Sequence, residues 1–197
     1  GYSDITVLHS HIHSLFDLPT LHSTMPIHFM EDFSDTMATS TLKAALCGNL
    51  KQLEYTILSH PLNRIGQCKG KLIGGNLSIL YALCGRISDI DTDGKILFIE
   101  DLDEYLYHID RMMLNLKRSG KLANLAGLII GGMSDMKDNL VPYGKNAYEI
   151  IAEHKGSEMV GMKYEPLYPF MSDLLPADQK SKLENTYQVY AADFVTT

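Results

Sequence analysis

Residues 94–105, with the sequence GKILFIEDLDEY, constrain the fold of this chain more than any other segment. Residues 96–99 are an unbroken apolar run shortly after Gly94, a pattern typical of a strand covered on both faces. From Asp101 onward apolar residues return at steps of three and four, which predicts a helix over 101–118. Glu100 is therefore predicted at a junction between strand and helix, with its carboxylate near a crevice. The local alternative is an acid that only caps the helix.

The predicted 101–118 helix has one apolar face and a polar remainder. We expect its polar residues Asp103, Asp110 and Lys117 to face water. The residues expected to be buried are Leu102, Leu106, Ile109, Met113 and Leu116.

Strand and helix patterns alternate on both sides of this segment. Residues 1–58 predict a helix near the start, short strands near 20–21 and 53–58, and a helix at 39–46. The elements expected after residue 70 are a strand ending in a Gly-Gly turn at 74–75, a helix at 77–84, the strand at 96–99, the helix at 101–118, a strand at 127–130 with a second Gly-Gly turn, and a helix at 146–153. The alternation predicts an α/β fold with a partly parallel sheet.

Composition narrows the possible partners and compartment. The 197 residues include 17 basic and 24 acidic side chains, for a net charge of −7, which argues against a nucleic-acid partner. No run approaches the roughly 18 apolar residues that span a bilayer, so no membrane partner is expected. Cys47, Cys68 and Cys84 are an odd number without paired spacing, which favours a reducing compartment and predicts a cytoplasmic protein.

Ser3 and Asp4 precede another stretch with helical spacing. Its apolar residues are Ile5, Leu8, Ile12, Leu15 and Phe16. At a helix N-terminus, free backbone N–H groups and the helix dipole favour developing negative charge, which suits a serine nucleophile. The alternative is that Ser3 is only an N-cap residue. The pattern is not the Gly-x-Ser-x-Gly elbow of α/β-hydrolases, because Ile5 replaces the second glycine.

Four motifs together resemble the serine L,D-carboxypeptidases of the S66 type, a family that includes muramoyl-tetrapeptide carboxypeptidases and microcin self-immunity peptidases. The motifs lie at 1–6 (GYSDIT), 71–80 (KLIGGNLSIL), 94–105 and 127–139 (GLIIGGMSDMKDN). The resemblance extends to about residue 153. It implies that 1–60 is the end of an N-terminal, flavodoxin-like α/β nucleophile domain, 61–69 a linker and 70–155 a smaller α/β C-terminal domain. Residues 156–197 match nothing in the family and form an unassigned tail.

The resemblance also implies catalytic roles. Ser3 is the nucleophile, the backbone N–H of Asp4 donates to the oxyanion, and Glu100 orients a catalytic histidine. The family carries that histidine in a Gly-aromatic-Pro-x-Gly-His segment after the 146–153 helix. This chain has no such segment, has no histidine after His154, and lacks the family's Arg-Gly-Gly-Tyr-Gly loop. We therefore expect a catalytically incomplete chain, explained most simply by a partial or rearranged reading frame.

The implied reaction is hydrolysis of the bond to a C-terminal D-amino acid, as in release of D-alanine from murein tetrapeptide during cell-wall recycling. The expected partner is a murein-derived or similar small peptide. The resemblance implies no cofactor, and a homodimer for the full-length family. Gly74, Gly75 and Asn76 are candidate walls of the substrate cleft, with tight turns as the alternative. A non-catalytic peptide-binding or assembly module that retains the fold also stays open.

A metal hydrolase is a third hypothesis, because histidines are frequent near the N-terminus. They are His9, His11, His13, His22 and His28. Alternating histidines share one face of a strand and suit zinc, but on a helix only His9 and His13 lie together. Because the helical spacing is the stronger signal, we predict no metal site.

Overall fold

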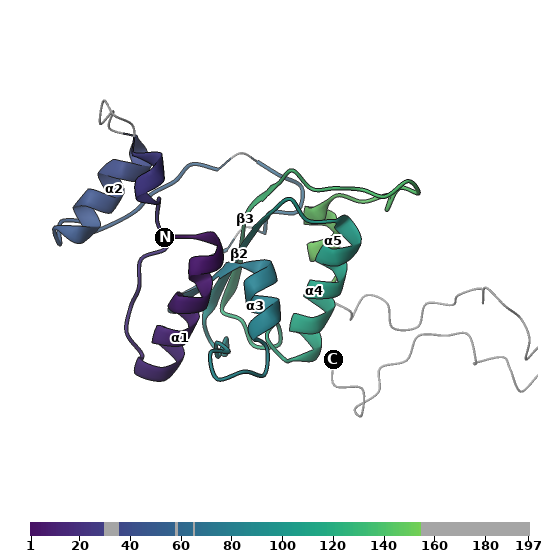
Figure 1. Cartoon of the computed structure of the whole chain (residues 1–197), viewed down its shortest axis with the longest axis horizontal. Helices are drawn as coiled ribbons and strands as arrows, with labels where there is room; N and C mark the ends of the chain where they lie inside the picture. The colour runs from purple at the N-terminus through teal and green to yellow at the C-terminus, as the bar shows by residue number, and fades with distance from the viewer. Residues whose placement is uncertain (30–35, 58, 65, 155–197) are drawn as a thin grey trace, which may run out of the picture. The chain divides into compact units, whose positions relative to one another are not determined.

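The structure is a computed structural model that describes residues 1–29, 36–57, 59–64 and 66–154. The predicted tail at 156–197 lies outside these ranges. The chain divides into two compact units, Gly1–Ala152 and Glu153–Thr197, and the fold below is that of the first unit (Figure 1). Within the described ranges, no helix is both long enough and apolar enough to cross a membrane.

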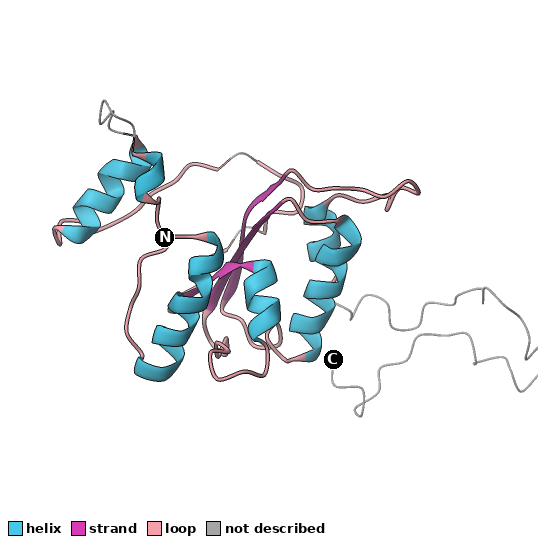
Figure 2. Ribbon diagram, viewed as in Figure 1, coloured by secondary structure: helices cyan, strands magenta, loops and turns pink. Residues whose placement is uncertain are grey.

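A parallel sheet lies at the centre of the first unit (Figure 2). Its strands, hydrogen-bonded in chain order, are β1 (Leu72–Asn76), β2 (Ile96–Leu102) and β3 (Gly127–Ser134). Each parallel pair is joined through a helix, as parallel strands require. The α/β class and the parallel pairing predicted from the sequence are confirmed. The predicted domain boundaries at residues 60, 69 and 155 stay predictions.

Helices pack beside this sheet. Their bounds are α1 (Thr6–Phe16), α2 (Met37–Leu46), α3 (Leu77–Leu83), α4 (Leu106–Arg118) and α5 (Ala147–Glu153), with short 3-10 helices η1 (Ser3–Ile5) and η2 (Pro26–His28). α3 contacts both α1 and α4, and these three form a row beside the strands in Figure 1. The helices predicted near residues 5–16, 39–46, 77–84 and 146–153 are confirmed to within a few residues.

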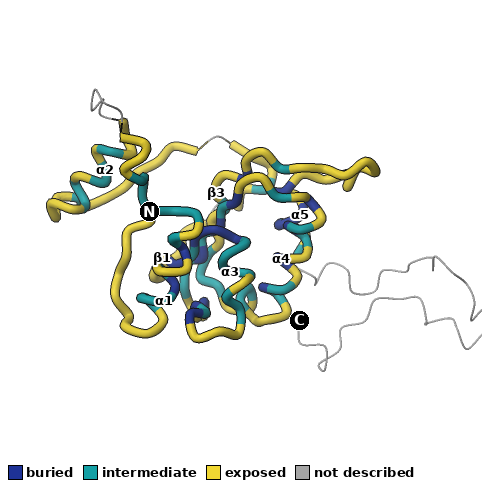
Figure 3. The backbone as a smooth tube through the Cα atoms, in the orientation of Figure 1, coloured by how far each residue is buried: buried dark blue, intermediate teal, exposed yellow. Residues whose placement is uncertain are grey.

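The core lies between the sheet and α3, α4 and α5 (Figure 3). Leu97 and Ile99 of β2 and Ile109 of α4 are almost completely buried. The buried face predicted for α4 is confirmed at Leu106, Ile109, Met113 and Leu116, and Met112 joins it. Asp110 and Lys117, expected in water, are half-buried.

The boundary predicted between β2 and α4 was wrong by five residues. β2 continues through Glu100 and Asp101 to Leu102, because Asp101 pairs with Met133 of β3 beyond an irregularity in the register. Asp103 then turns the chain with φ +64°, and α4 begins only at Leu106. Leu102 is consequently 57% exposed rather than buried. Glu100 therefore lies within a strand and not at the junction.

Other predictions of local structure also need correction. The two Gly-Gly pairs lie within β1 and β3 rather than in turns. Gly74 has φ +131°, and a Cβ there would lie 1.9 Å from the Phe98 carbonyl oxygen, so the close approach of β2 explains this glycine. No strand forms at 20–21 or at 53–57, where no parallel neighbour lies alongside, and residue 58 lies outside the described ranges.

α1 does not bury the apolar face that its sequence predicted. Leu8, Leu15 and Phe16 are exposed, and the buried residues of the helix are Thr6 and Ser10. Small polar side chains allow the helix to approach β1 more closely than leucine would. The helix is therefore held by hydrogen bonds and close backbone packing at its start.

Candidate active site

Ser3 has an unusual backbone conformation at the start of a helix. Its φ of +57° lies in the left-handed region, which costs a residue with a side chain on the order of 1–3 kcal/mol. Ser3 begins η1, which continues directly into α1. The first backbone N–H groups of a helical segment lack partners within it and attract negative charge. A half-buried hydroxyl in this position suits a nucleophile that develops charge next to backbone donors.

The helix that begins here is attached to the end of β1. The backbone N–H of Asn76 donates to Thr6 Oγ1 over 3.0 Å, and Thr6 is completely buried. Gly75, with φ +146°, permits this contact, because a Cβ on it would lie 2.5 Å from Thr6 Oγ1. In open α/β sheets, ligands bind beyond the carboxyl ends of the strands, and Asn76 is the last residue of β1.

Glu100 lies near the carboxyl end of β2, opposite Asn76 in the register. Its side chain is half-buried, and Oε1 is buried with no hydrogen-bond partner among the described residues. Burial raises the pKa of Glu100, the neighbouring charge of Asp101 raises it further, and a hydrogen bond from the Asn76 side chain opposes both effects. An acceptor oxygen in this state is available to an N–H donor such as an imidazole.

Asp101, the next residue, has its acceptor positions occupied. Its carboxylate accepts hydrogen bonds from Asn76 Nδ2 over 3.0 Å and from the backbone N–H of Ser78 and Leu102 over 2.9 Å each. Burial nevertheless raises its pKa. Asp101 thus holds the start of α3 and the end of β1 together, which leaves Glu100 as the carboxylate with an unpartnered oxygen.

The structure shows where each predicted site residue lies. Ser3 is half-buried at the start of η1, and Asp4 is exposed in the same short helix. Gly75 and Asn76 are buried under the start of α1. Asn76 caps α3 by accepting from the N–H of Ile79 over 3.2 Å. That Ser3 and Glu100 serve one reaction stays a prediction.

The N-terminal histidines do not converge on one point. His11 lies on a different face of α1 from His9 and His13. The Nδ1 atom of His11 hydrogen-bonds with Ser88 Oγ at 2.8 Å. His9 Nε2 lies 3.0 Å from the carbonyl oxygen of Gly1. Throughout the described ranges, no three histidine, cysteine or acidic side chains are arranged to hold a metal ion.

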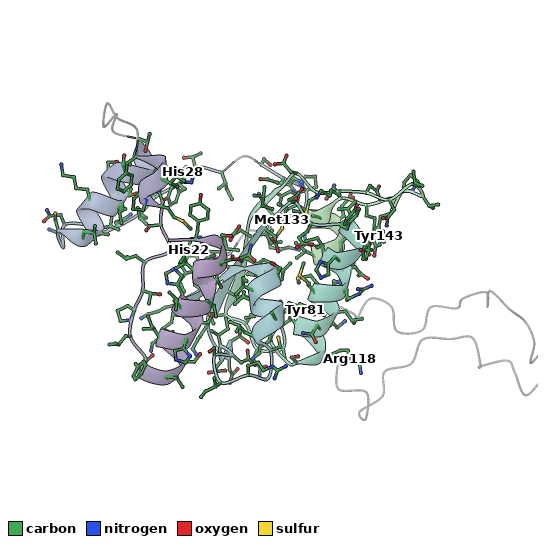
Figure 4. All side chains as sticks on the ribbon, in the orientation of Figure 1. His22, His28, Tyr81, Arg118, Met133 and Tyr143 are labelled. Carbon is green, nitrogen blue, oxygen red and sulfur yellow. The ribbon has the colours of Figure 1, made fainter. Side chains whose placement is uncertain are left out.

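Two further histidines lie in the segment after α1 (Figure 4). His22 meets the edge of the Phe98 ring at 4.9 Å between centroids, and His28 hydrogen-bonds with the Tyr2 hydroxyl. In α4, His108 Nδ1 lies 2.6 Å from Glu104 Oε2. None of these histidines forms a hydrogen bond with Oε1 of Glu100.

Sequence reasoning missed Thr6 and Asp101. Thr6 was not predicted because it is a polar residue on the buried side of α1, whereas the helical spacing is that of leucine and isoleucine residues. Asp101 was assigned to the first turn of a helix. One usable signal was Asn76, since asparagine before an apolar run is a typical N-cap and marks the start of α3, where Asp101 accepts its hydrogen bonds.

Comparison with known proteins places these features in a family context. Residues 69–166 match the family model for the LD-carboxypeptidase C-terminal domain. The chain is 41% identical over 134 residues to a probable murein peptide carboxypeptidase of Bacillus subtilis, covering 66% of this chain and 41% of that protein. It is 28% identical over 144 residues to the murein tetrapeptide carboxypeptidase of Pseudomonas aeruginosa, covering 68% and 46%. The chain thus spans less than half the length of these relatives.

The fold of this chain is also similar to that of solved structures. Muramoyltetrapeptide carboxypeptidase from Oxalobacter formigenes matches with a TM-score of 0.60 and 26% identity, over 77% of this chain and 51% of that chain. The microcin C7 self-immunity protein MccF, in its wild-type apo state, matches with a TM-score of 0.58 and 22% identity, over 78% and 54%. The second likeness concerns the fold alone.

Proposed function

Because the chain belongs to the LD-carboxypeptidase (peptidase S66) family, we propose that it supplies the nucleophile and the orienting carboxylate of a serine-type L,D-carboxypeptidase. The proposed substrate is a murein tetrapeptide, from which the enzyme releases the C-terminal D-alanine. The observation that carries the proposal is the left-handed backbone of Ser3 at the start of a helical segment. Strain of this kind is retained where a reactive side chain must be presented.

In the proposed reaction, Ser3 Oγ attacks the carbonyl carbon of the bond to D-alanine while a histidine accepts the hydroxyl proton. The oxyanion of the tetrahedral intermediate accepts a hydrogen bond from the backbone N–H of Asp4. The intermediate collapses, the C–N bond breaks, and the histidine returns the proton to the leaving amine. Water then hydrolyses the ester on Ser3.

Glu100 is proposed to orient that histidine. Its buried Oε1 has no partner among the described residues, so it can accept the second ring N–H of an imidazole. A cationic imidazolium beside it would lower the pKa of the carboxyl and offset the effect of burial. The sequence beyond His154 contains no histidine to fill this role. The homodimer and the cytoplasmic location also stay predictions.

The second candidate function is a peptide-binding or assembly module that retains the fold. Such a module would bind murein peptide without releasing D-alanine. The two functions differ in whether Ser3 forms a covalent ester, which mass spectrometry of the intact protein detects.

The decisive test joins this chain to the remaining parts of a full-length relative. Residues 1–154 replace the corresponding part of the Bacillus subtilis relative, and D-alanine release from murein tetrapeptide is measured. We expect release that is lost in Ser3→Ala and strongly reduced in Glu100→Gln, with both variants folded. Release that survives Ser3→Ala would assign the chemistry to another residue. Binding of tetrapeptide without release by the folded chimera would favour the second function.

A further inference from the structure

The last residue of β1 is bonded to the helix that begins at the candidate nucleophile. The backbone N–H of Asn76 donates to Thr6 Oγ1 over 3.0 Å. Thr6 is 0% exposed and Asn76 6% exposed, so water does not replace this hydrogen bond. A buried N–H at a strand end costs free energy if it lacks an acceptor, and a threonine side chain supplies one here.

The packing around this hydrogen bond leaves little freedom. A Cβ on Gly75 would lie 2.5 Å from Thr6 Oγ1 and 2.8 Å from Thr6 Cγ2, so the side chain rests directly on the strand backbone. Both branches of the threonine are used: the hydroxyl accepts a hydrogen bond and the methyl group fills the space over the glycine.

The side chain of Asn76 continues the connection to β2. Its Nδ2 donates to Asp101 Oδ1 over 3.0 Å, and Asp101 directly follows Glu100 in the strand. Asn76 also lies opposite Glu100 in the register. Successive contacts therefore connect the start of α1 to the strand that carries Glu100, whose Oε1 has no hydrogen-bond partner among the described residues.

We propose that Thr6 is a positioning residue which, through Asn76, holds the segment that carries Ser3 at a fixed spacing from Glu100. The inference rests on the proposed function, in which Ser3 and Glu100 act on the same reaction. Ser3 lies three residues before Thr6, in η1, which continues directly into α1, so a shift of α1 would move the nucleophile with it. Misplacement by about 1 Å at a reacting group can cost on the order of 10²-fold in rate.

The test uses the 197-residue chain and does not need catalysis. Thr6→Val keeps the shape but removes the acceptor, whereas Thr6→Ser keeps the hydroxyl. Hydrogen exchange of the Asn76 amide and the carbon-13 titration of the Glu100 carboxyl are followed by NMR. In Thr6→Val we expect Asn76 exchange to be about tenfold faster and the Glu100 pKa to move toward its ordinary value as water reaches the carboxyl. Thr6→Ser should restore both.

The titration separates positioning from simple support of the fold. A merely structural Thr6 would lower the melting temperature of Thr6→Val and leave the titration of Glu100 unchanged, which would overturn the proposal. Should Thr6→Val fail to fold, Thr6→Ala tests the same point. A wild-type Asn76 amide that exchanges as fast as exposed amides would also overturn it.

These results are independent of the D-alanine assay. A changed titration in Thr6→Val with no Ser3-dependent release by the chimera would support the contact and reject the enzyme function. Ser3-dependent release with an unchanged titration would reject the role of Thr6 alone.

Discussion

Ser3 carries backbone strain that a residue without a side chain would not have. Its φ of +57° is readily adopted by glycine and disfavoured for serine. We expect Ser3→Gly to raise the free energy of unfolding by about 1 kcal/mol, a typical cost of a left-handed residue with a side chain. Urea unfolding of the purified chain measures this. Ser3→Ala, which keeps the Cβ, is the matched control, and equal stability of the two variants would show that Ser3 is not strained.

Glu100 makes stability depend on pH in a direction opposite to that of a salt-bridged acid. Because burial raises its pKa above the ordinary value of 4.5, the folded state binds the proton more tightly than the unfolded state. The stability it contributes is therefore present below that value and is lost as pH rises through the folded pKa. Glu100→Gln keeps a neutral side chain at every pH, so we expect it to match the wild type near pH 3.5 and to exceed its stability at pH 8.

Denaturant unfolding at the two pH values checks this expectation. The neighbouring Asp101, whose pKa is also raised, is present in both proteins. Because its charge raises the pKa of Glu100, relief of the repulsion between the two carboxylates is part of the stability expected of Glu100→Gln at pH 8. Glu54→Gln changes an exposed residue and serves as the control. If Glu100→Gln loses stability at pH 8, the ionised carboxylate has a favourable partner in the folded chain and is not vacant.

At the scale of elements, α4 is the helix whose buried face the apolar spacing of the sequence predicted most fully. It also offers a matched pair of leucines. Leu106 is 9% exposed in the core, whereas Leu114 on the same helix is 45% exposed. We expect Leu106→Ala to cost about 2–5 kcal/mol, because it leaves a cavity. Leu114→Ala should cost within about 0.5 kcal/mol, as is usual for surface positions. Chemical denaturation of both variants is the measurement, and equal losses would show that the helix face is assigned incorrectly.

The elements could be predicted where one physical signal dominated. The unbroken apolar run of β2 and the helical spacing of α4 identified both elements, since burial of those residues stabilises both. The continuation of β2 through Asp101 was not predictable, because a buried aspartate in a strand is stable only with donors such as Asn76 and Ser78, which come from other elements. For the same reason the Gly74-Gly75 pair resembled a turn until its close neighbours were known.

At the scale of the whole molecule, the proposed site draws on segments far apart in the sequence. Ser3 precedes the sheet and Glu100 lies in its middle strand. Asn76 donates a hydrogen bond to Thr6, three residues after Ser3, and lies opposite Glu100 in the register. Sequence motifs predicted the roles of Ser3 and Glu100 through a family resemblance. The role of Thr6 could be inferred only from its contacts with Gly75 and Asn76. The proposed reaction further requires a histidine, oriented by Glu100, that takes the proton of Ser3 and returns it to the leaving amine.

That requirement leads to a prediction about the 197-residue chain on its own. No described histidine contacts the unpartnered oxygen of Glu100, and no histidine follows His154 in the sequence. Members of a catalytic triad act as a unit, so loss of the base alone removes most of the rate enhancement, on the order of 10⁴–10⁶-fold. We therefore expect negligible D-alanine release from murein tetrapeptide by this chain, measured beside the chimera that supplies a histidine segment.

Ser3→Ala in the 197-residue chain is the control for background hydrolysis, and the chain and this variant should be indistinguishable. Strong release by the unmodified chain that Ser3→Ala abolishes would mean that a histidine within residues 1–154 already serves as the base. His22, His28 and His108 would then be replaced singly by glutamine, because each lies in a contact that a small rearrangement could redirect. Negligible release would agree with the finding that, among the described residues, Glu100 Oε1 has no hydrogen-bond partner.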